Sequence, residues 1–448
     1  MADRPHVVRI VAHDAGQHVG CYGIDTVDTP HLDRLADEGV RFENSFCVAP
    51  QCSPSRASMV TGRYPHSNGV MGLSHDGFAW ELHADEQHLA ALLSDAGWHS
   101  ALAGTHHATR GDDAFDEVVA GGGSAEGVAD AAAQAIQERA DDGEAEPLHL
   151  QVGFFEPHRR PQNPSEFPTP SEPDAYGDAT LPEYLLDEAS AHDEIRAFEA
   201  AVERMDAGAG RVLDALDAAG VADDTVVVAT TDHGIPFPRA KCSPYDPGLE
   251  TFLLMRWPGG LPAGETVDAP VTTVDHLPTL FDLLDLDAPD AVQGVSHAAA
   301  ARDEESVGEG TPPRETVFAE LTHHDYTDPR RAIRAEGYKC IVNFTNAPFF
   351  MDPSQQHRPG TVTRTPSAPK LAYHPPVELY DLEDDPLETE NLADDPAHAE
   401  ARADLLDRLH EWMQATGDPL LDGIPTPPMY DAAIESLERG SVVDPADR

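Results

Sequence analysis

Runs of apolar residues with the length of buried strands recur through the first half of the chain, and helical patterns separate them. Four such runs predict strands, at residues 6–12, 98–103, 148–155 and 225–231. Amphipathic or Ala-rich stretches predict helices, at residues 30–38, 86–96, 125–140 and 190–219. Strands that alternate with helices form a largely parallel sheet covered on both faces, so we predict an α/β fold built on one large sheet.

The pattern changes after about residue 300. Residues 302–315 are acidic and contain Gly and Pro, which is typical of a linker or an exposed loop. Beyond them we expect three short strands and one helix, at residues 316–320, 338–342, 378–381 and 397–415. We therefore predict a main domain at 1–315 and a smaller subdomain at 316–448, with an antiparallel sheet, a helix and a Pro-rich tail that drapes over the surface from Gly417.

Polar residues follow the predicted strands at the points where those strands end. His13 and Asp14 follow the first strand, His107 and His158 follow the next two, and Asp232 and His233 follow the last. Ligands of such sheets bind beyond the carboxyl ends of the strands. The topology alone therefore predicts that these residues converge on one active site.

Cys52 stands at the start of a predicted helix, with Ser53 as the expected N-cap and Pro54 at the first helical position. The positive end of the helix and the nearby Arg56 favour an anionic thiol. The same geometry attracts oxyanions such as sulfate or phosphate. This segment predicts a nucleophile beside an anion-binding site.

Charge and cysteine content narrow the class of protein. The chain has 81 acidic and 29 basic side chains, a formal net charge of −52, which argues against binding nucleic acid. The acidity is spread over the whole length, so we expect a folded protein with an acidic surface, as in a high-salt cytoplasm. Five cysteines are too few and too scattered for a disulfide framework. With no signal-peptide pattern and no membrane-spanning run, we predict a cytoplasmic protein without membrane contact.

Several sequence blocks resemble the formylglycine-dependent sulfatase family of the alkaline phosphatase superfamily. The most specific is the pentapeptide Cys52-Ser53-Pro54-Ser55-Arg56 followed by Thr61-Gly62-Arg63. Further blocks, at residues 29–35, 39–42 and 62–66, occur in the family's order. Residues 232–238 and 378–382 are similar to its sulfamidase-like members, the heparan N-sulfatases. The resemblance runs from about residue 6 to about residue 415, and it implies that the domain at 1–315 is catalytic.

The resemblance implies the following chemistry. A separate maturation enzyme oxidises Cys52 to an aldehyde, whose hydrate attacks the sulfate ester. Arg56 steadies this group, and Lys241 contacts the sulfate, with Arg239 as a competing candidate. His107 and His158 are candidate proton donors, since imidazole exchanges protons near neutral pH. The family's usual Lys two residues before His107 is replaced here by Thr105.

The expected metal site contains two carboxylates and two imidazoles. We expect a divalent ion to be held by His13, Asp14, Cys52, Asp232 and His233, with Cys52 in its modified form. Ca2+ is the family's usual ion and suits the carboxylates. The imidazoles shift the preference toward Mn2+ or Zn2+, so Ca2+ is expected only slightly ahead of them.

Three functions follow from these residues. The leading one is a sulfatase that hydrolyses a sulfate ester or sulfamate, for example of a sugar. Its expected partners are a small-molecule or saccharide sulfate and the maturation enzyme. The alternatives are a phosphonate monoester or phosphodiester hydrolase, and a non-catalytic binding protein. Loops at 159–185 and 322–370 are expected to form the pocket walls, and the oligomeric state stays open. For His323, His324 and Asp325, a polar turn and a role in the substrate pocket are equally consistent with the sequence. For Arg330, Arg331 and Arg334, binding of an anionic substrate is not favoured over pairing with the acidic surface.

Overall fold

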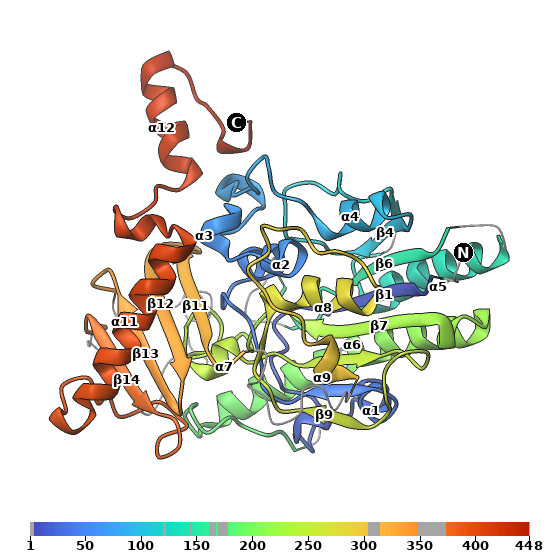
Figure 1. Cartoon of the computed structure of the whole chain (residues 1–448), viewed down its shortest axis with the longest axis horizontal. Coiled ribbons are helices and arrows are strands. Elements are labelled where there is room, and N and C mark those ends of the chain that lie inside the picture. Colours follow the sequence, from blue (N-terminus) through green and yellow to red (C-terminus); the bar gives the residue numbers. More distant parts are fainter. Residues whose placement is uncertain are drawn as a thin grey trace.

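The computed structural model describes residues 4–119, 122–142, 146–160, 167–168, 178–302, 314–347 and 373–447. Its centre is an eight-stranded sheet with the order β5-β4-β6-β1-β7-β8-β2-β9 (Figure 1). The strands are β1 His6–Ala12, β2 Val40–Phe42, β4 His99–Gly104, β5 Glu117–Val119, β6 Leu148–Gly153, β7 Thr225–Thr231, β8 Leu253–Arg256 and β9 Glu265–Val267. A two-stranded sheet joins β3 Ser45–Phe46 to β10 Val271–Thr272. Only β8 runs antiparallel to its neighbours, so the prediction of one large, mostly parallel sheet is confirmed.

Helices cover both faces of this sheet because its strands alternate between two apolar cores. In β1, Val8 and Ile10 belong to one core, and Val7 and Val11 belong to the other. The first core is closed by α1 Pro30–Asp37, α5 Ala125–Asp141 and α6 Ala189–Ala219. The second is closed by α2 Cys52–Thr61, α4 Leu89–Asp95, α8 His276–Leu283 and α9 Ala298–Ala301. Two single turns, α3 Pro65–Asn68 and α7 Asp246–Leu249, complete the main domain.

The strand register places the ends of four strands level with one another. Ala12 of β1 is opposite Thr231 of β7, and Gly153 of β6 is opposite both Val11 and Gly104. Gly153 is required here, because an added Cβ would lie 1.8 Å from the carbonyl oxygen of Thr105. The segments that follow these strands therefore start from one edge of the sheet.

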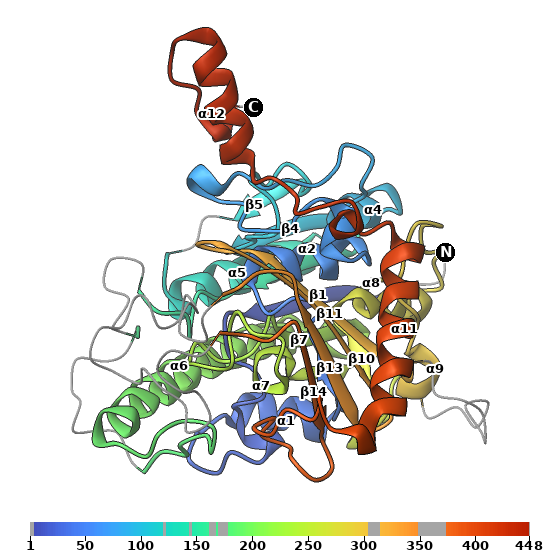
Figure 2. The ribbon, with the colours of Figure 1, turned by 90° about the vertical axis from the view of Figure 1, so that its left-hand side faces the viewer.

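A four-stranded antiparallel sheet forms the predicted smaller subdomain. Its strands are β11 Val317–His323, β12 Thr327–Ala335, β13 Tyr338–Asn343 and β14 Val377–Asp381, and α11 Ala399–Thr416 covers it (Figures 1 and 2). The predicted apolar face of α11 is confirmed, since Leu405, Leu409 and Trp412 are buried against this sheet. The subdomain is tied to α7 by Lys339, which forms ion pairs with Asp246 and, at 3.0 Å, with Glu388.

Two elements of the subdomain were not predicted. β12 was missed because its three arginines interrupt the apolar pattern. The tail was expected to drape over the surface, but it contains α12 Pro428–Arg439, which stands away from the body in Figure 2. Prolines cluster before this helix and occupy its first position, where proline is well tolerated.

The predicted pocket walls lie only partly within the described residues. Of the loops expected to form pocket walls, residues 161–166, 169–177 and 348–372 lie outside the described residues. The boundary at residue 315 stays a prediction. Among the described residues, we find no helix with the length and apolar character needed to cross a membrane.

Candidate active site

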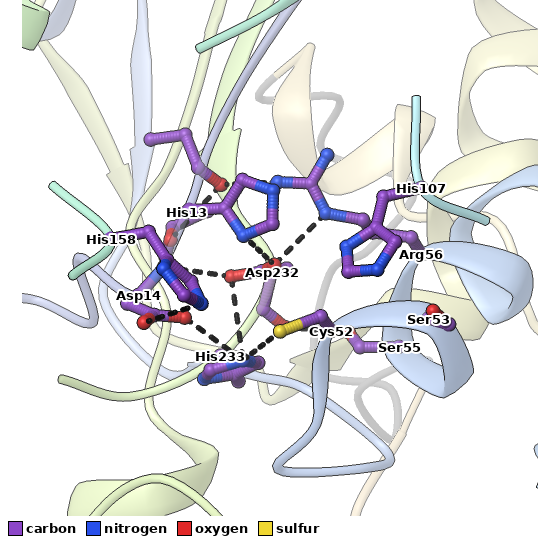
Figure 3. A network of polar contacts seen from close by, with 12 residues as sticks. His13, Asp14, Cys52, Ser53, Ser55, Arg56, His107, His158, Asp232 and His233 are labelled. Atoms are coloured by element: carbon purple, nitrogen blue, oxygen red, sulfur yellow. Dashed lines mark hydrogen bonds and ion pairs between the residues drawn. The ribbon is translucent and has the colours of Figure 1, made fainter. Parts of the chain in front are cut away.

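The strand ends bring together the residues predicted to surround Cys52 (Figure 3). Two overlapping groups have ligand atoms that all lie within 4.8 Å of one another; they are His13, Asp14, Cys52 and His158, and Asp14, Cys52, Asp232 and His233. The Sγ atom of Cys52 lies 3.4 Å from Nε2 of His233. The sequence-based expectation of one site at this edge therefore agrees with the geometry.

Two hydrogen bonds to Asp232 fix its position in this cluster. Asp14 has a left-handed φ of 51°, a conformation that Asp tolerates, and its N–H donates to Oδ1 of Asp232 at 2.9 Å. The hydroxyl of Ser55 donates to the carbonyl oxygen of Asp232 at 2.5 Å. The sequence indicated no role for Ser55 beyond the motif. In the structure, its hydroxyl helps to position Asp232, one of the expected metal ligands.

Arg56 is buried, so the alternative of a surface ion pair is excluded. Its Nε donates to Oδ2 of Asp232 at 2.9 Å. Its two terminal nitrogens donate to the carbonyl oxygens of Ala12 and His106, at 3.0 and 3.3 Å. One guanidinium therefore links the helix of Cys52 to the ends of β1, β4 and β7.

Lys241, and not Arg239, lies in the cluster. Its Nζ donates to both carboxylate oxygens of Asp14, at 3.0 and 2.9 Å. Arg239 instead donates to the carbonyl oxygens of Leu387 and Glu388, and its guanidinium lies over the ring of Tyr245. Arg239 thus fastens the subdomain, whereas Lys241 carries the positive charge that the sequence placed at the site.

The prediction of an anionic thiol at Cys52 is wrong. The side chain is 2% exposed, and burial raises the pKa of the Cys52 thiol to about 12 even though Lys241 opposes the shift. The helix also begins two residues earlier than expected, with Gln51 as the N-cap and Cys52 as the first residue. The unmodified thiol stays protonated at neutral pH and is a poor nucleophile.

The two carboxylates, in contrast, stay ionised. Burial alone would raise the pKa of Asp14, but Lys241, His158 and His233 together hold it below its ordinary value. The pKa of Asp232 is lowered in the same way, against burial, by His233 and Arg56. Each carboxylate is therefore an anionic oxygen donor at neutral pH.

His158 and His107 lie on opposite sides of the cluster, His158 beside Asp14 and His107 beside Arg56 (Figure 3). Nδ1 of His158 donates to the carbonyl oxygen of Arg159 at 2.6 Å, and burial followed by Lys241 lowers its pKa to about 4. Burial followed by Arg56 lowers the pKa of His107 well below its ordinary value. Both imidazoles are neutral at pH 7 in this state.

His75 was not predicted, and it extends the site toward solvent. Its Nδ1 lies 2.7 Å from Nε2 of His107, and His75 itself is exposed. His75 follows no strand and belongs to no matching motif, so nothing in the local sequence could have identified it.

The remaining candidates divide between the edge of the site and the scaffold. His324 is at the edge: burial lowers its pKa, and Lys241 and His233 are among the charges that act on it. His323 stacks on Trp80 and bonds to Thr327. The three arginines of β12 are structural, since they pair with buried acids: Arg330 with Asp328, Arg331 with Glu320 and Asp418, and Arg334 with Asp246.

A sheet edge that presents ionised carboxylates, buried cations and a helix-borne Cys is the arrangement of a hydrolase for anionic esters. A family model described as Sulfatase matches residues 5–286, and one described as N-sulphoglucosamine sulphohydrolase, C-terminal, matches residues 240–355. The chain belongs to the sulfatase family, whose members hydrolyse sulfuric esters with a formylglycine and a divalent metal.

Individual relatives agree with this assignment. Human N-sulphoglucosamine sulphohydrolase is 30% identical, over 92% of this chain and 90% of the relative. A protein solved with its substrate D-glucosamine-2-N,6-O-disulfate superposes with a TM-score of 0.68 at 20% identity, covering 93% of this chain and 99% of that one. The phosphonate monoester hydrolase of Silicibacter pomeroyi superposes with a TM-score of 0.69 at 20% identity, covering 93% and 96%. The two structures show the fold alone, and the predicted α/β fold and sulfatase family are confirmed.

Proposed function

We propose that this sulfatase removes sulfate from an amino sugar, with the sulfamate of a glucosamine-type saccharide as its preferred substrate. The observation that supports this proposal most directly is the match of residues 240–355 to the C-terminal part of N-sulphoglucosamine sulphohydrolase. That segment includes Lys241 and His324, which lie at the site and at its edge. The human relative and the disulfated glucosamine complex point to the same chemistry.

The high pKa of Cys52 supports maturation of this residue to formylglycine by a separate enzyme. A buried thiol that keeps its proton is a poor nucleophile. A hydrated aldehyde provides two hydroxyls on one carbon, one to attack sulfur and one to lose a proton so that sulfate is released. The cluster around Cys52 contains no other nucleophile of comparable placement among the described residues.

The donor set fits a divalent metal. Asp14, Asp232 and His233 surround the Cys52 side chain and would hold the ion, with His13 adjacent. When bound, a divalent ion neutralises sulfate charge and polarises the nucleophile. Ca2+, which the resemblance implies first, and Mn2+ or Zn2+ all accept the two carboxylates; they differ in whether they also accept imidazole.

The other charged residues bind and orient the sulfate group. Lys241 supplies an ammonium beside Cys52, and Arg56 fixes Asp232 and the helix start. For the proton of the leaving amine we favour His107 over His158. His107 bonds to the exposed His75, which offers a path for protons from solvent, whereas Nε2 of His158 faces Asp14 at 3.8 Å.

The cellular setting is part of the proposal. None of the five cysteines forms a disulfide, and the net charge is −52, which suits a reducing, salt-rich cytoplasm. We propose that location, with no nucleic acid or membrane as partner. The domain division at residue 315 also belongs to this proposal.

One experiment tests the function directly. The chain is produced together with a formylglycine-generating enzyme, and the tryptic peptide of residues 42–56 is examined by mass spectrometry for the aldehyde at Cys52. Sulfate release is then measured from glucosamine N-sulfate, glucosamine 6-sulfate and an aryl sulfate, with C52A as the control. We expect N-sulfate to be the best saccharide substrate. Activity of a fully unmodified protein would contradict the proposal.

A phosphonate monoester hydrolase remains the second candidate, because the fold neighbour from Silicibacter pomeroyi carries that name and Thr105 removes a cation usual in sulfatases. Lys241 and Arg56 still leave two cations in the described part of the cluster, which favours the sulfatase. Faster turnover of an aryl phosphonate than of every sulfated compound would reverse this order.

A further inference from the structure

The imidazole of His233 is oriented as a metal ligand would be. Nδ1 of His233 lies 2.9 Å from the carbonyl oxygen of Gly234, and because a carbonyl only accepts, this nitrogen carries the hydrogen. Nε2 is therefore the nitrogen that faces Oδ1 of Asp14 at 3.2 Å and Oδ1 of Asp232 at 3.7 Å. A histidine whose second nitrogen is fixed by a backbone carbonyl is the usual arrangement of a metal-binding imidazole.

His13 adds a second buried nitrogen donor beside Asp232. The residue is 1% exposed, and among the described residues neither of its ring nitrogens has a partner with hydrogen-bond geometry. Its Nδ1 lies 3.3 Å from Oδ2 of Asp232, and its ring packs 5.2 Å from that of His158. A buried polar group without a partner is costly, and an ion beside Asp232 would remove that cost.

Oxygen donors are scarce at the same position. Among the described residues of the two clusters, the carboxylate oxygens come only from Asp14 and Asp232. Arg56 and a backbone N–H already occupy the oxygens of Asp232, and Lys241 contacts both oxygens of Asp14. Ca2+ takes six to eight oxygen ligands and does not favour imidazole. Mn2+ and Zn2+ accept mixed carboxylate and imidazole sets.

We infer that this site selects a transition-metal ion, Mn2+ or Zn2+, over Ca2+, with His233 and His13 as nitrogen ligands beside Asp14 and Asp232. The inference concerns the same site as the proposed function and rests on it for the role of the ion. It departs from the Ca2+ that the resemblance implies. The departure arises mainly from His13, which stands where the family usually has an Asp, and His233 adds a second imidazole to the same set.

Metal binding itself provides the test. The matured, full-length protein is freed of metal with a chelator, and Mn2+ and Ca2+ are titrated separately by calorimetry in the same KCl buffer. We expect Mn2+ to bind at least about tenfold more tightly than Ca2+. Pulsed electron paramagnetic resonance of the Mn2+ form should show 14N coupling from imidazole, a signal that requires no variant.

Variants then assign the ligands. H233N, alone or with H13D, supplies oxygen donors and should lower the preference for Mn2+ over Ca2+ by about tenfold or more. H410N removes an exposed imidazole on α11 and should leave both affinities unchanged. Tighter binding of Ca2+ by the unaltered protein, or bound Mn2+ without 14N coupling, would overturn the inference. Neither result depends on sulfate release, so a failure of the proposed substrate would be recognised separately.

Discussion

At the scale of single residues, the site depends on side chains that make several contacts at once. Arg56 is the clearest example, because its three nitrogens hold one carboxylate and two strand-end carbonyls. A residue of this kind acts on catalysis through the groups that it positions. The structure therefore changes its expected role from a direct stabiliser of the nucleophile to a positioning residue.

We predict that R56K lowers both activity and stability. Lysine keeps the charge but cannot donate in three directions, so two buried carbonyl groups lose their partner. We expect kcat/KM to fall at least about 100-fold, and the free energy of unfolding to fall by about 3 kcal/mol, as for other broken buried ion pairs. Urea unfolding and sulfate release measure the two effects. R211K, at an exposed ion pair with Asp130, is the matched control and should change little.

A second prediction concerns the proton donor. If His107 protonates the leaving group, H107Q should slow sulfamate hydrolysis by about 100-fold or more, because an amine leaves poorly without a proton. Hydrolysis of an aryl sulfate with an acidic phenol should change far less. H75Q should show the same pattern more weakly, mainly in kcat. Equal losses on both substrates would show that His107 has a structural role instead.

At the scale of elements, the subdomain is fastened to the main domain by buried charges. His66 of α3 bonds to Glu320 of β11, and Arg331 of β12 connects Glu320 to Asp418, which follows α11. Three of these residues have the spacing of a metal site. The guanidinium of Arg331 already supplies the positive charge there, so we interpret the group as an ion-pair network.

We predict that D418A loosens this attachment. It leaves Arg331 with one buried acidic partner, Glu320, instead of two and removes the side chain that accepts from the N–H of Leu420. The free energy of unfolding should fall by about 3 kcal/mol, and limited proteolysis should release the segment that contains α12 sooner. D422A changes an exposed acid four residues further on, and it should behave like the parent protein.

At the scale of the whole molecule, net charge and buried histidines set the conditions of stability. With a charge of −52, repulsion between acidic side chains opposes folding. Screening shortens the range of this repulsion, from about 10 Å at 0.1 M salt to about 3 Å at 1 M. We predict that the Tm rises steadily with KCl over this range. A Tm that is independent of salt would contradict the halophilic interpretation.

Two buried histidines should make the stability of the folded protein fall in mild acid. Burial lowers the pKa of His88 and of His276 to about 3, so the folded chain does not bind these protons until far below pH 6.5, whereas the unfolded chain binds them there. Stability is therefore lost as the pH falls from 6.5 toward 3, by up to about 1.4 kcal/mol per pH unit for each histidine. Urea unfolding at pH 7.5 and 5.5 tests this. H276N should flatten the dependence, and an unchanged slope would refute the assignment.

The sequence predicted the parts of this molecule that depend on local pattern. The strands around β1 and the convergence of Asp14, His158 and Asp232 follow from periodicity and from the geometry of parallel sheets. The protonated state of Cys52 did not follow, because burial is a property of the folded site and outweighs the helix end. β12 was missed since its buried arginines find acidic partners only in three dimensions. His75 was missed since its contact with His107 joins two distant loops.

The scarcity of lysine has a practical consequence for anyone who handles the enzyme. Of its three lysines, Lys241 is 7% exposed and Lys339 is fully buried in ion pairs. Amine-reactive reagents therefore meet neither of these side chains readily while the protein is folded. Coupling to a resin or dye through amines should leave the active site unmodified, and a sudden rise in reactive amines would report unfolding.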